Sequence, residues 1–227
     1  MKAVISKVAE TKMVSHDSGL VAYNSGISVS TDVMQIVPTM AQGDDTGMRT
    51  GNRVTAKNLS IKGHMLMSLA VSNISTSVRI AVRQMVLVSK RYKNFSDMQT
   101  NFASHLPFLL KSGNSVQGFT GIIQDLYLPI NREIYTVLYD KIVYLNLEYQ
   151  ATASGFQGVA DSVKFFNINV KCKNKILNYE ESNSNVPQNW NPFMCFGYAK
   201  LDGATPDVAL NLALYAQHIT NLTYTDL

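Results

Sequence analysis

Charged residues and long apolar runs are both scarce in this sequence. Only 16% of the 227 residues are charged, and no apolar run reaches the roughly 18 residues that a membrane-spanning helix requires. The first ten residues, MKAVISKVAE, lack the continuous apolar stretch of a secretory signal. We therefore expect a soluble protein that neither inserts into a membrane nor is secreted.

Cysteine is also rare, because Cys172 and Cys195 are the only two in the chain. One disulfide between them is an alternative, but widely spaced cysteines in an intracellular chain are more often buried thiols. The sequence therefore predicts two free thiols in the protein interior.

Motifs that carry catalysis are missing from the sequence. It has no G-x-S-x-G elbow, phosphate loop, dinucleotide fingerprint or H-E-x-x-H zinc motif. The histidines stand apart from one another and from both cysteines, at His16, His64, His105 and His218. Asp44 and Asp45 could offer oxygens to calcium, but GDDTG lacks the EF-hand spacing and suits a tight turn. We predict no enzyme activity, no cofactor and no metal site, although a site assembled from distant residues stays open.

What the chain does have is a composition typical of β-strands joined by polar turns. Hydrophobic residues make up 46% of the chain, which is enough to bury a core. Alternation of apolar and polar residues predicts one strand at 27–37 and eight more after residue 43. These eight lie at 58–69, 78–89, 133–139, 141–149, 162–172, 175–179, 191–199 and 207–224.

Residues 90–132 interrupt the strands with a long excursion. Within NFSDMQTNFASHLPFLL, Ser96 is a candidate helix N-cap, and Pro107 ends a short apolar periodicity. A second loop, ESNSNVPQNWNP, holds the only tryptophan, Trp190. Long structured loops on a β framework usually carry a contact surface, so we expect these two loops to do so.

Basic charge is concentrated in the first half of the chain. Residues 1–113 hold 13 Lys and Arg against 6 Asp and Glu, a net +7, while residues 114–227 hold 7 against 10, a net −3. Such a distribution suits a polyanion such as nucleic acid, and ordinary surface scatter is the alternative. The basic residues of the N-terminus and of the segment before the first long strand are Lys2, Lys7, Lys12, Arg49, Arg53, Lys57 and Lys62.

The segment GDDTGMRTGNRV, followed by a long strand, resembles the start of the core in capsid proteins of small circular single-stranded DNA viruses. It is also similar to coat proteins of the satellite tobacco necrosis virus type. The matching positions are Gly43, Asp44, Arg49, Gly51, Asn52 and Arg53. The order of strands and loops agrees over residues 43–227. The resemblance implies an all-β fold, a single eight-stranded antiparallel jelly roll of two packed four-stranded sheets, with a short helix in a long inter-strand loop.

The resemblance also implies a function and an organisation. Residues 1–42 would form an N-terminal arm with one additional strand, and residues 43–227 the jelly-roll capsid domain. The chain would assemble with itself into a small icosahedral shell of about 60 copies. That shell would enclose a single-stranded circular DNA genome, bound without sequence preference. Localisation would be the virion, assembled inside the host cell, with the nucleus as a candidate compartment.

Site residues follow from the same resemblance. Nucleic acid would contact Lys2, Lys7, Lys12, Arg49, Arg53 and Lys57, and subunit contacts would involve Phe108, Trp190 and Phe193. The arm lacks the dense arginine of many relatives, so either the inner wall carries genome packaging, through residues such as Arg49, Arg53 and Lys57, or the chain is a shortened form. The runner-up function is a jelly-roll carbohydrate-binding or lectin-like module, which would form small oligomers rather than shells. The host receptor stays unknown.

Overall fold

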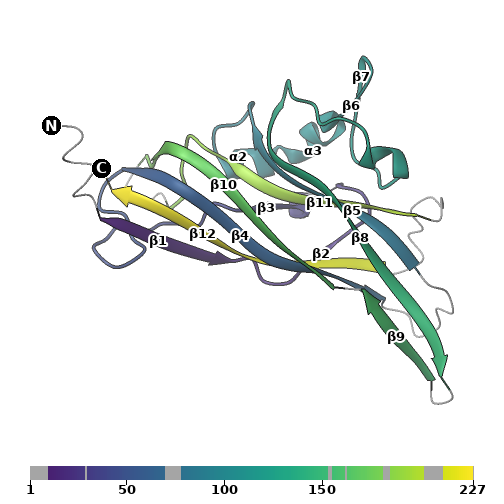
Figure 1. Cartoon of the computed structure of the whole chain (residues 1–227). Helices are drawn as coiled ribbons and strands as arrows, with labels where there is room; N and C mark the ends of the chain where they lie inside the picture. The colour runs from purple at the N-terminus through teal and green to yellow at the C-terminus, as the bar shows by residue number, and fades with distance from the viewer. Residues whose placement is uncertain are drawn as a thin grey trace.

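Antiparallel strands in two five-stranded sheets make up most of the structure, which is a computed structural model (Figure 1). It describes residues 10–28, 30–69, 78–152, 155–161, 163–180, 185–201 and 212–226. The first sheet consists of β1 (Thr11–Asp17), β2 (Val21–Tyr23), β4 (Arg53–Leu69), β10 (Val163–Asn178) and β12 (Leu212–Asp226). The second sheet consists of β3 (Val33–Gln35), β5 (Val78–Ser89), β8 (Tyr135–Thr152), β9 (Gly155–Asp161) and β11 (Pro192–Lys200).

The strands pair in a nested order, the first with the last and so on inward. β1 pairs with β12, β3 with β11, β4 with β10 and β5 with β8, and every pair is antiparallel. A chain wound in this way forms a jelly roll, in which two antiparallel sheets pack face to face. The predicted all-β jelly roll is therefore confirmed, with β2 and β9 as additional strands at its edges.

The eight strands predicted after residue 43 correspond to six strands in the structure. The other two strands of the jelly roll come from residues 1–42, where we expected an arm with one additional strand. The segments 133–139 and 141–149 form one strand, β8, and the segments 162–172 and 175–179 form another, β10. A bulge between Lys171 and Lys175 keeps β10 paired with β4 across the apparent break, with Lys173 and Asn174 at positive φ. The missing two strands, β1 and β3, lie within residues 1–42. The expected division between an arm and a core at residue 42 thus differs from the observed pairing, in which residues 11–35 belong to both sheets.

The main core lies between the two sheets. Leu59, Ile61 and Met65 of β4 point into it, as the alternation of that strand predicts, and all three are fully buried. Gly63 continues the same row. A Cβ at this position would lie 2.2 Å from the carbonyl oxygen of Gln217 and 2.8 Å from the Cβ of His218. Glycine is therefore required where β4 and β12 approach each other this closely.

A covering segment, residues 90–134, packs on the other side of the second sheet (Figure 1). It contains α2 (Phe95–Thr100), α3 (Phe102–His105), η2 (Leu106–Phe108), β6 (Leu110–Ser112), β7 (Ser115–Gln117) and η3 (Ile123–Leu126), and the remaining 3-10 helix of the chain is η1 (Ser30–Asp32). Asn94, not Ser96, is the N-cap of α2, because its side chain accepts a hydrogen bond from the Asp97 amide at 2.8 Å. Among the described residues, no helix is long and apolar enough to cross a membrane.

Arg83 of β5 fastens this covering segment to the sheet. Its guanidinium donates to both carboxylate oxygens of Asp140 at 2.8 and 2.7 Å, and to the carbonyls of Asp125 and Leu128 at 2.8 and 2.7 Å. The Asp125 carboxylate accepts from the amides of Thr120 and Gly121 at 2.6 and 3.0 Å. Arg83 and Asp125 are both buried. The hydrogen bonds that hold the covering segment are therefore largely shielded from water.

Both cysteines are free and buried, which confirms the expectation of two interior thiols. Burial raises the pKa of Cys172 to about 11 and raises the pKa of Cys195 further still. A thiol of raised pKa is a poor nucleophile at neutral pH, because only the thiolate reacts.

Candidate nucleic-acid and subunit interfaces

The first sheet has one face turned away from the core, which we call the open face. It consists of the side chains that alternate with the buried ones in β1, β12, β4 and β10. Asn58 and Ser60 of β4 belong to it, next to Asn169 of β10 and Asn221 of β12. In Figure 1 the helices and the β6–β7 hairpin lie on the opposite side of the sandwich. The two faces of the molecule thus differ, because one is covered by its own chain and the other is open, with polar side chains and a few exposed apolar ones such as Met13 and Ile219.

Positive charge dominates the open face. Arg53 and Lys62 of β4 and Lys171 of β10 occupy outward positions and are exposed, and Lys57 is exposed at the bulge of β4. Among the outward positions of the described strands in this sheet, the acidic side chain is Asp17 of β1, which accepts a hydrogen bond from Gln217 at 3.1 Å. Lys171 was not among the predicted contacts, because it comes from the half of the sequence with net negative charge. Only strand pairing brings it beside β4.

Arg49 is not on this face, contrary to our expectation. It is fully buried, with its guanidinium 4.5 Å from the centre of the Tyr179 ring. It donates to the carbonyl of Gly51 at 2.7 Å and to the side-chain oxygen of Asn52 at 3.1 Å. The glycine-rich segment folds back around Arg49 and uses its donors internally, so its role is to order the turn before β4.

This placement predicts different effects for two neighbouring arginines. Arg49→Ala should lower the free energy of unfolding by about 2–4 kcal/mol, because it removes a buried cation–π contact and charged hydrogen bonds. Arg53→Ala, the matched control at an exposed position, should change stability by less than about 0.5 kcal/mol. Urea unfolding followed by circular dichroism measures both. Equal small losses for the two variants would show that Arg49 is not structurally required.

The N-terminal lysines are only partly described. Lys2 and Lys7 lie outside the described residues. Lys12 forms an ion pair with Asp226 at 3.0 Å and donates to the Met48 carbonyl at 3.4 Å. The hydrogen bond to Asp226 raises the pKa of Lys12. Its charge is therefore already matched within the chain, which makes it a weaker candidate for a phosphate contact than Arg53 or Lys62.

The three predicted subunit-contact residues fall into two groups. Phe193, on β11, is buried, with its ring packed edge-on against Tyr135 at a centroid separation of 6.1 Å, so it belongs to the interior and not to a contact surface. Phe108 is half-buried in the covering segment, and the Arg91 guanidinium lies 5.3 Å from the centre of its ring. Trp190 is half-buried and packs against the core between the sheets. Phe108 and Trp190 are the two that still reach the surface.

Other apolar side chains of the covering segment are more exposed than either of these. Tyr127, which follows η3, is 70% exposed, and Val116 of β7 is 37% exposed. Neither was predicted, because a single exposed residue in a loop leaves no periodic signal in the sequence. Together with Phe108, they give the covering segment an apolar surface opposite the open face.

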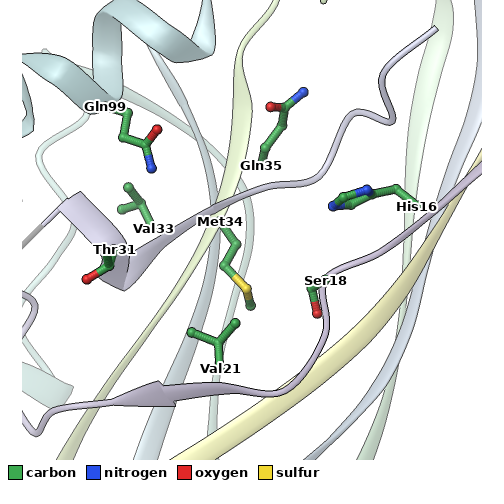
Figure 2. A pocket seen from close by; sticks show the side chains of 8 residues that line it. All are labelled: His16, Ser18, Val21, Thr31, Val33, Met34, Gln35 and Gln99. Atoms are coloured by element: carbon green, nitrogen blue, oxygen red, sulfur yellow. The ribbon is translucent and has the colours of Figure 1, made fainter.

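A pocket of about 280 Å³ lies where the chain crosses from the first sheet to the second (Figure 2). His16 and Ser18 line one side of it, and Gln35 and Gln99 the other. The amide of Gln35 donates to the Val37 carbonyl at 2.8 Å, and that of Gln99 to the Ser30 carbonyl at 3.4 Å. The first bond serves a local turn and the second joins α2 to η1, so the pocket walls are part of the scaffold.

Groups that could support metal or acid–base chemistry do not gather in the described part of the chain. Its His, Cys, Asp and Glu side chains form no group of three that could hold a metal ion. The GDDTG segment forms a turn, in which the Met48 amide donates to the Asp45 carbonyl at 3.0 Å, and Asp44 and Asp45 are both exposed. His105 and His218 are buried, and burial is the first cause of the lowered pKa of each.

Comparison with known proteins gives only weak structural similarities. The chain matches no protein-family model and none of the curated proteins. Among solved structures it is similar to the infectious bursal disease virus VP2 subviral particle, with a TM-score of 0.26, 11% identity, and coverage of 97% of this chain and 38% of that one. It is also similar to the T13 IBDV viral particle, with a TM-score of 0.23, 8% identity, and coverage of 96% and 40%. Both neighbours are viral capsid particles and the similarity is weak; the chain spans about two fifths of their length.

Proposed function

We propose that this protein is a structural coat protein, which assembles with copies of itself into a closed icosahedral shell around single-stranded nucleic acid. The observation that supports this most is the difference between the two faces of the jelly roll. The open face carries Arg53, Lys62 and Lys171 against one acidic side chain among its described positions. The opposite side is closed by the covering segment, on which Val116 and Tyr127 are exposed, while Met13, Phe165 and Ile219 are exposed apolar side chains of the open face itself. A shell subunit needs such a division between a surface for a polyanion and a surface for neighbouring copies.

The finer parts of the proposal rest on the resemblance seen in the sequence. They are a circular DNA genome, a shell of about 60 copies, residence in the virion after assembly inside the host cell, and a protein without enzymatic activity. A chain with one jelly roll suits a simple shell, because closed symmetry can place identical subunits in identical environments. The lectin-like alternative differs in its assembly, since a binding module would remain a small oligomer.

Removing positive charge from the open face is expected to lower the nucleic acid content of the particles. In the variant Arg53→Ala/Lys62→Ala/Lys171→Ala, the ratio of absorbance at 260 and 280 nm of purified particles should fall. For the unassembled subunit, the slope of log affinity against log salt should decrease by about 2, because each phosphate contact contributes about 0.7 for single strands. The matched control Lys93→Ala/Arg132→Ala/Lys141→Ala removes three exposed charges from outside the open face and should leave both quantities unchanged.

Assembly itself is tested by sedimentation velocity and electron microscopy of the wild-type protein across a range of concentration and salt. Fast-sedimenting closed particles are expected. A protein that stays monomeric or forms only small oligomers under all these conditions would contradict the coat-protein proposal and favour the binding module. Particles that form but hold no nucleic acid would contradict the nucleic-acid part alone.

A further inference from the structure

Phe165 is the most exposed large apolar side chain of the described structure, at 84%. It lies on β10 at an outward position of the open face, directly opposite His64 of β4. Full burial of a phenylalanine is worth about 1.5–3 kcal/mol, and the fold gains almost none of this at Phe165. Within the described part of the chain the ring stays uncovered, so its surface is open to a partner.

The surroundings of Phe165 limit what can cover it. Its ring and the His64 ring have centroids 6.1 Å apart and planes inclined by 51°. Because Phe165 is 84% exposed, much of its ring surface stays open to a further contact. Lys62 lies two residues from His64 along β4, and Asn167 lies two residues from Phe165 along β10, directly opposite Lys62. Side chains two residues apart on one face of a strand are separated by about 6.6 Å. Asn167 is thus the next side chain of the open face after Phe165 along β10, and Lys62 is the diagonal neighbour of Phe165 on β4.

Beyond Asn167, the outward row of β10 continues with Asn169 and ends at Lys171. The row therefore presents, in order, an aromatic ring, two amides and an ammonium group, and it runs beside Lys62. This combination matches a chain of alternating bases and phosphates, since aromatic rings stack on bases and cations track the backbone. A double helix would not use it in the same way, because its bases are stacked on each other and their faces are hidden.

We propose that Phe165, supported by His64, is a stacking platform for an unpaired base of single-stranded nucleic acid, with Lys62 holding a phosphate next to that base and Lys171 a phosphate further along the strand. This inference rests on the proposed nucleic-acid function of the open face and specifies the kind of strand that the face prefers. Sequence preference is not required, because every base has a π-face.

The test uses the full-length unassembled subunit and two fluorescent probes, a 20-nucleotide oligothymidylate and a 20-base-pair duplex. Phe165→Ala should weaken binding of the oligothymidylate by about 5- to 100-fold, the loss that follows from removing one base stack. The salt slope should stay unchanged because no charge is removed, and duplex binding should change by less than about twofold. Phe165→Trp should retain wild-type affinity for the single strand, whereas Phe165→Leu, which is apolar but not planar, should lose it as alanine does.

Val163→Ala is the matched control, since Val163 is also exposed and lies two residues earlier on the same face; its affinity should equal that of the wild type. Thermal unfolding of the Phe165 variants should match the wild type, as expected for an exposed side chain. The inference is overturned if Phe165→Ala binds the single strand normally, if it loses duplex binding equally, or if it impairs only particle assembly, which would make the ring a contact between copies. A wild-type subunit that binds neither probe would instead contradict the nucleic-acid part of the proposed function.

Discussion

Arg83→Ala is expected to destabilise the protein by about 2–4 kcal/mol, because it removes a two-pronged contact with Asp140, whose side chain is 30% exposed, and takes a charged donor from two carbonyls of the covering segment. The guanidinium makes four hydrogen bonds, two to the Asp140 carboxylate and two to carbonyls of the covering segment. Without it, the carbonyls of Asp125 and Leu128 would lose charged donors in a buried environment. Urea unfolding followed by circular dichroism gives the loss of stability, and limited proteolysis should show faster cleavage within residues 90–134.

Two variants separate the geometry of Arg83 from its charge. Arg83→Lys keeps the charge but cannot form the two-pronged contact with Asp140, so it should recover only part of the stability. Arg79→Ala, at an exposed position four residues earlier on β5, should cost less than about 1 kcal/mol. If Arg83→Ala and Arg79→Ala lose similar small amounts, the covering segment is held mainly by its apolar contacts and not by Arg83.

Arg83 also illustrates what the sequence could not predict. The alternation of β5 correctly placed Arg83 on the side of the strand away from the core between the sheets. It did not indicate that the covering segment would bury that side as well. Arg49 and Arg53 present the same difficulty, since both occur in one polar segment and only the folded chain makes one buried and the other exposed. What lies over a residue is a tertiary property that periodicity does not report.

The strands β4 and β12 could be predicted because each has one wet face, and the edge strand β1 could not. β4 and β12 alternate clearly, and their inward residues Leu59, Ile61 and Leu222 are fully buried. β1 is an edge strand whose inward positions include Lys12 and His16, so its alternation is polar on both sides. Edge strands tolerate charged side chains because they are half-covered.

β11 was predicted as a strand, but the directions of its side chains could not be predicted. All nine of its residues are buried, because the main core covers one face of this strand and the covering segment the other. The sequence PFMCFGYAK is apolar throughout and cannot indicate which side is inside. Phe193 was therefore interpreted as a surface contact. The open-face cluster of Phe165, His64 and Lys62 was missed for a related reason, because its members meet only through the pairing of β4 with β10.

Lowering the pH from about 6.5 to 4 should destabilise the protein by about 3 kcal/mol through His218 alone. Burial, with a smaller effect of His16, lowers the pKa of His218 to about 4 from its ordinary value of 6.5, and Asp17 acts in the opposite direction. Between these two pH values the unfolded chain binds a proton at this position and the folded chain does not. Stability therefore falls as the pH falls, by about 1.36 kcal/mol for each unit of pKa difference.

The packing around His218 explains why it stays neutral in the fold. It is 1% exposed on β12 and lies directly opposite Gly63, and both nitrogens of its buried ring lack a hydrogen-bond partner among the described residues. Its backbone amide donates to the Ser18 hydroxyl at 3.0 Å, which ties β12 to the turn after β1. Protonation would place a charge in the core between the sheets, at the point where the two central strands of the first sheet are closest.

The measurement is the free energy of unfolding in urea at pH 7, 6, 5 and 4.5 for the wild type and for His218→Met, which cannot ionise. The wild type should lose stability across this range, and His218→Met should show a much smaller slope, whatever its stability at pH 7. A remaining slope of the same sign is expected from His105, whose pKa is also lowered by burial and by Arg91. Tyr215→Phe, on the same strand but at an outward position, should keep the wild-type slope. If His218→Met retains the full pH dependence, the ring is hydrated or hydrogen-bonded in the native protein, and the acid sensitivity of the fold must then come from other groups.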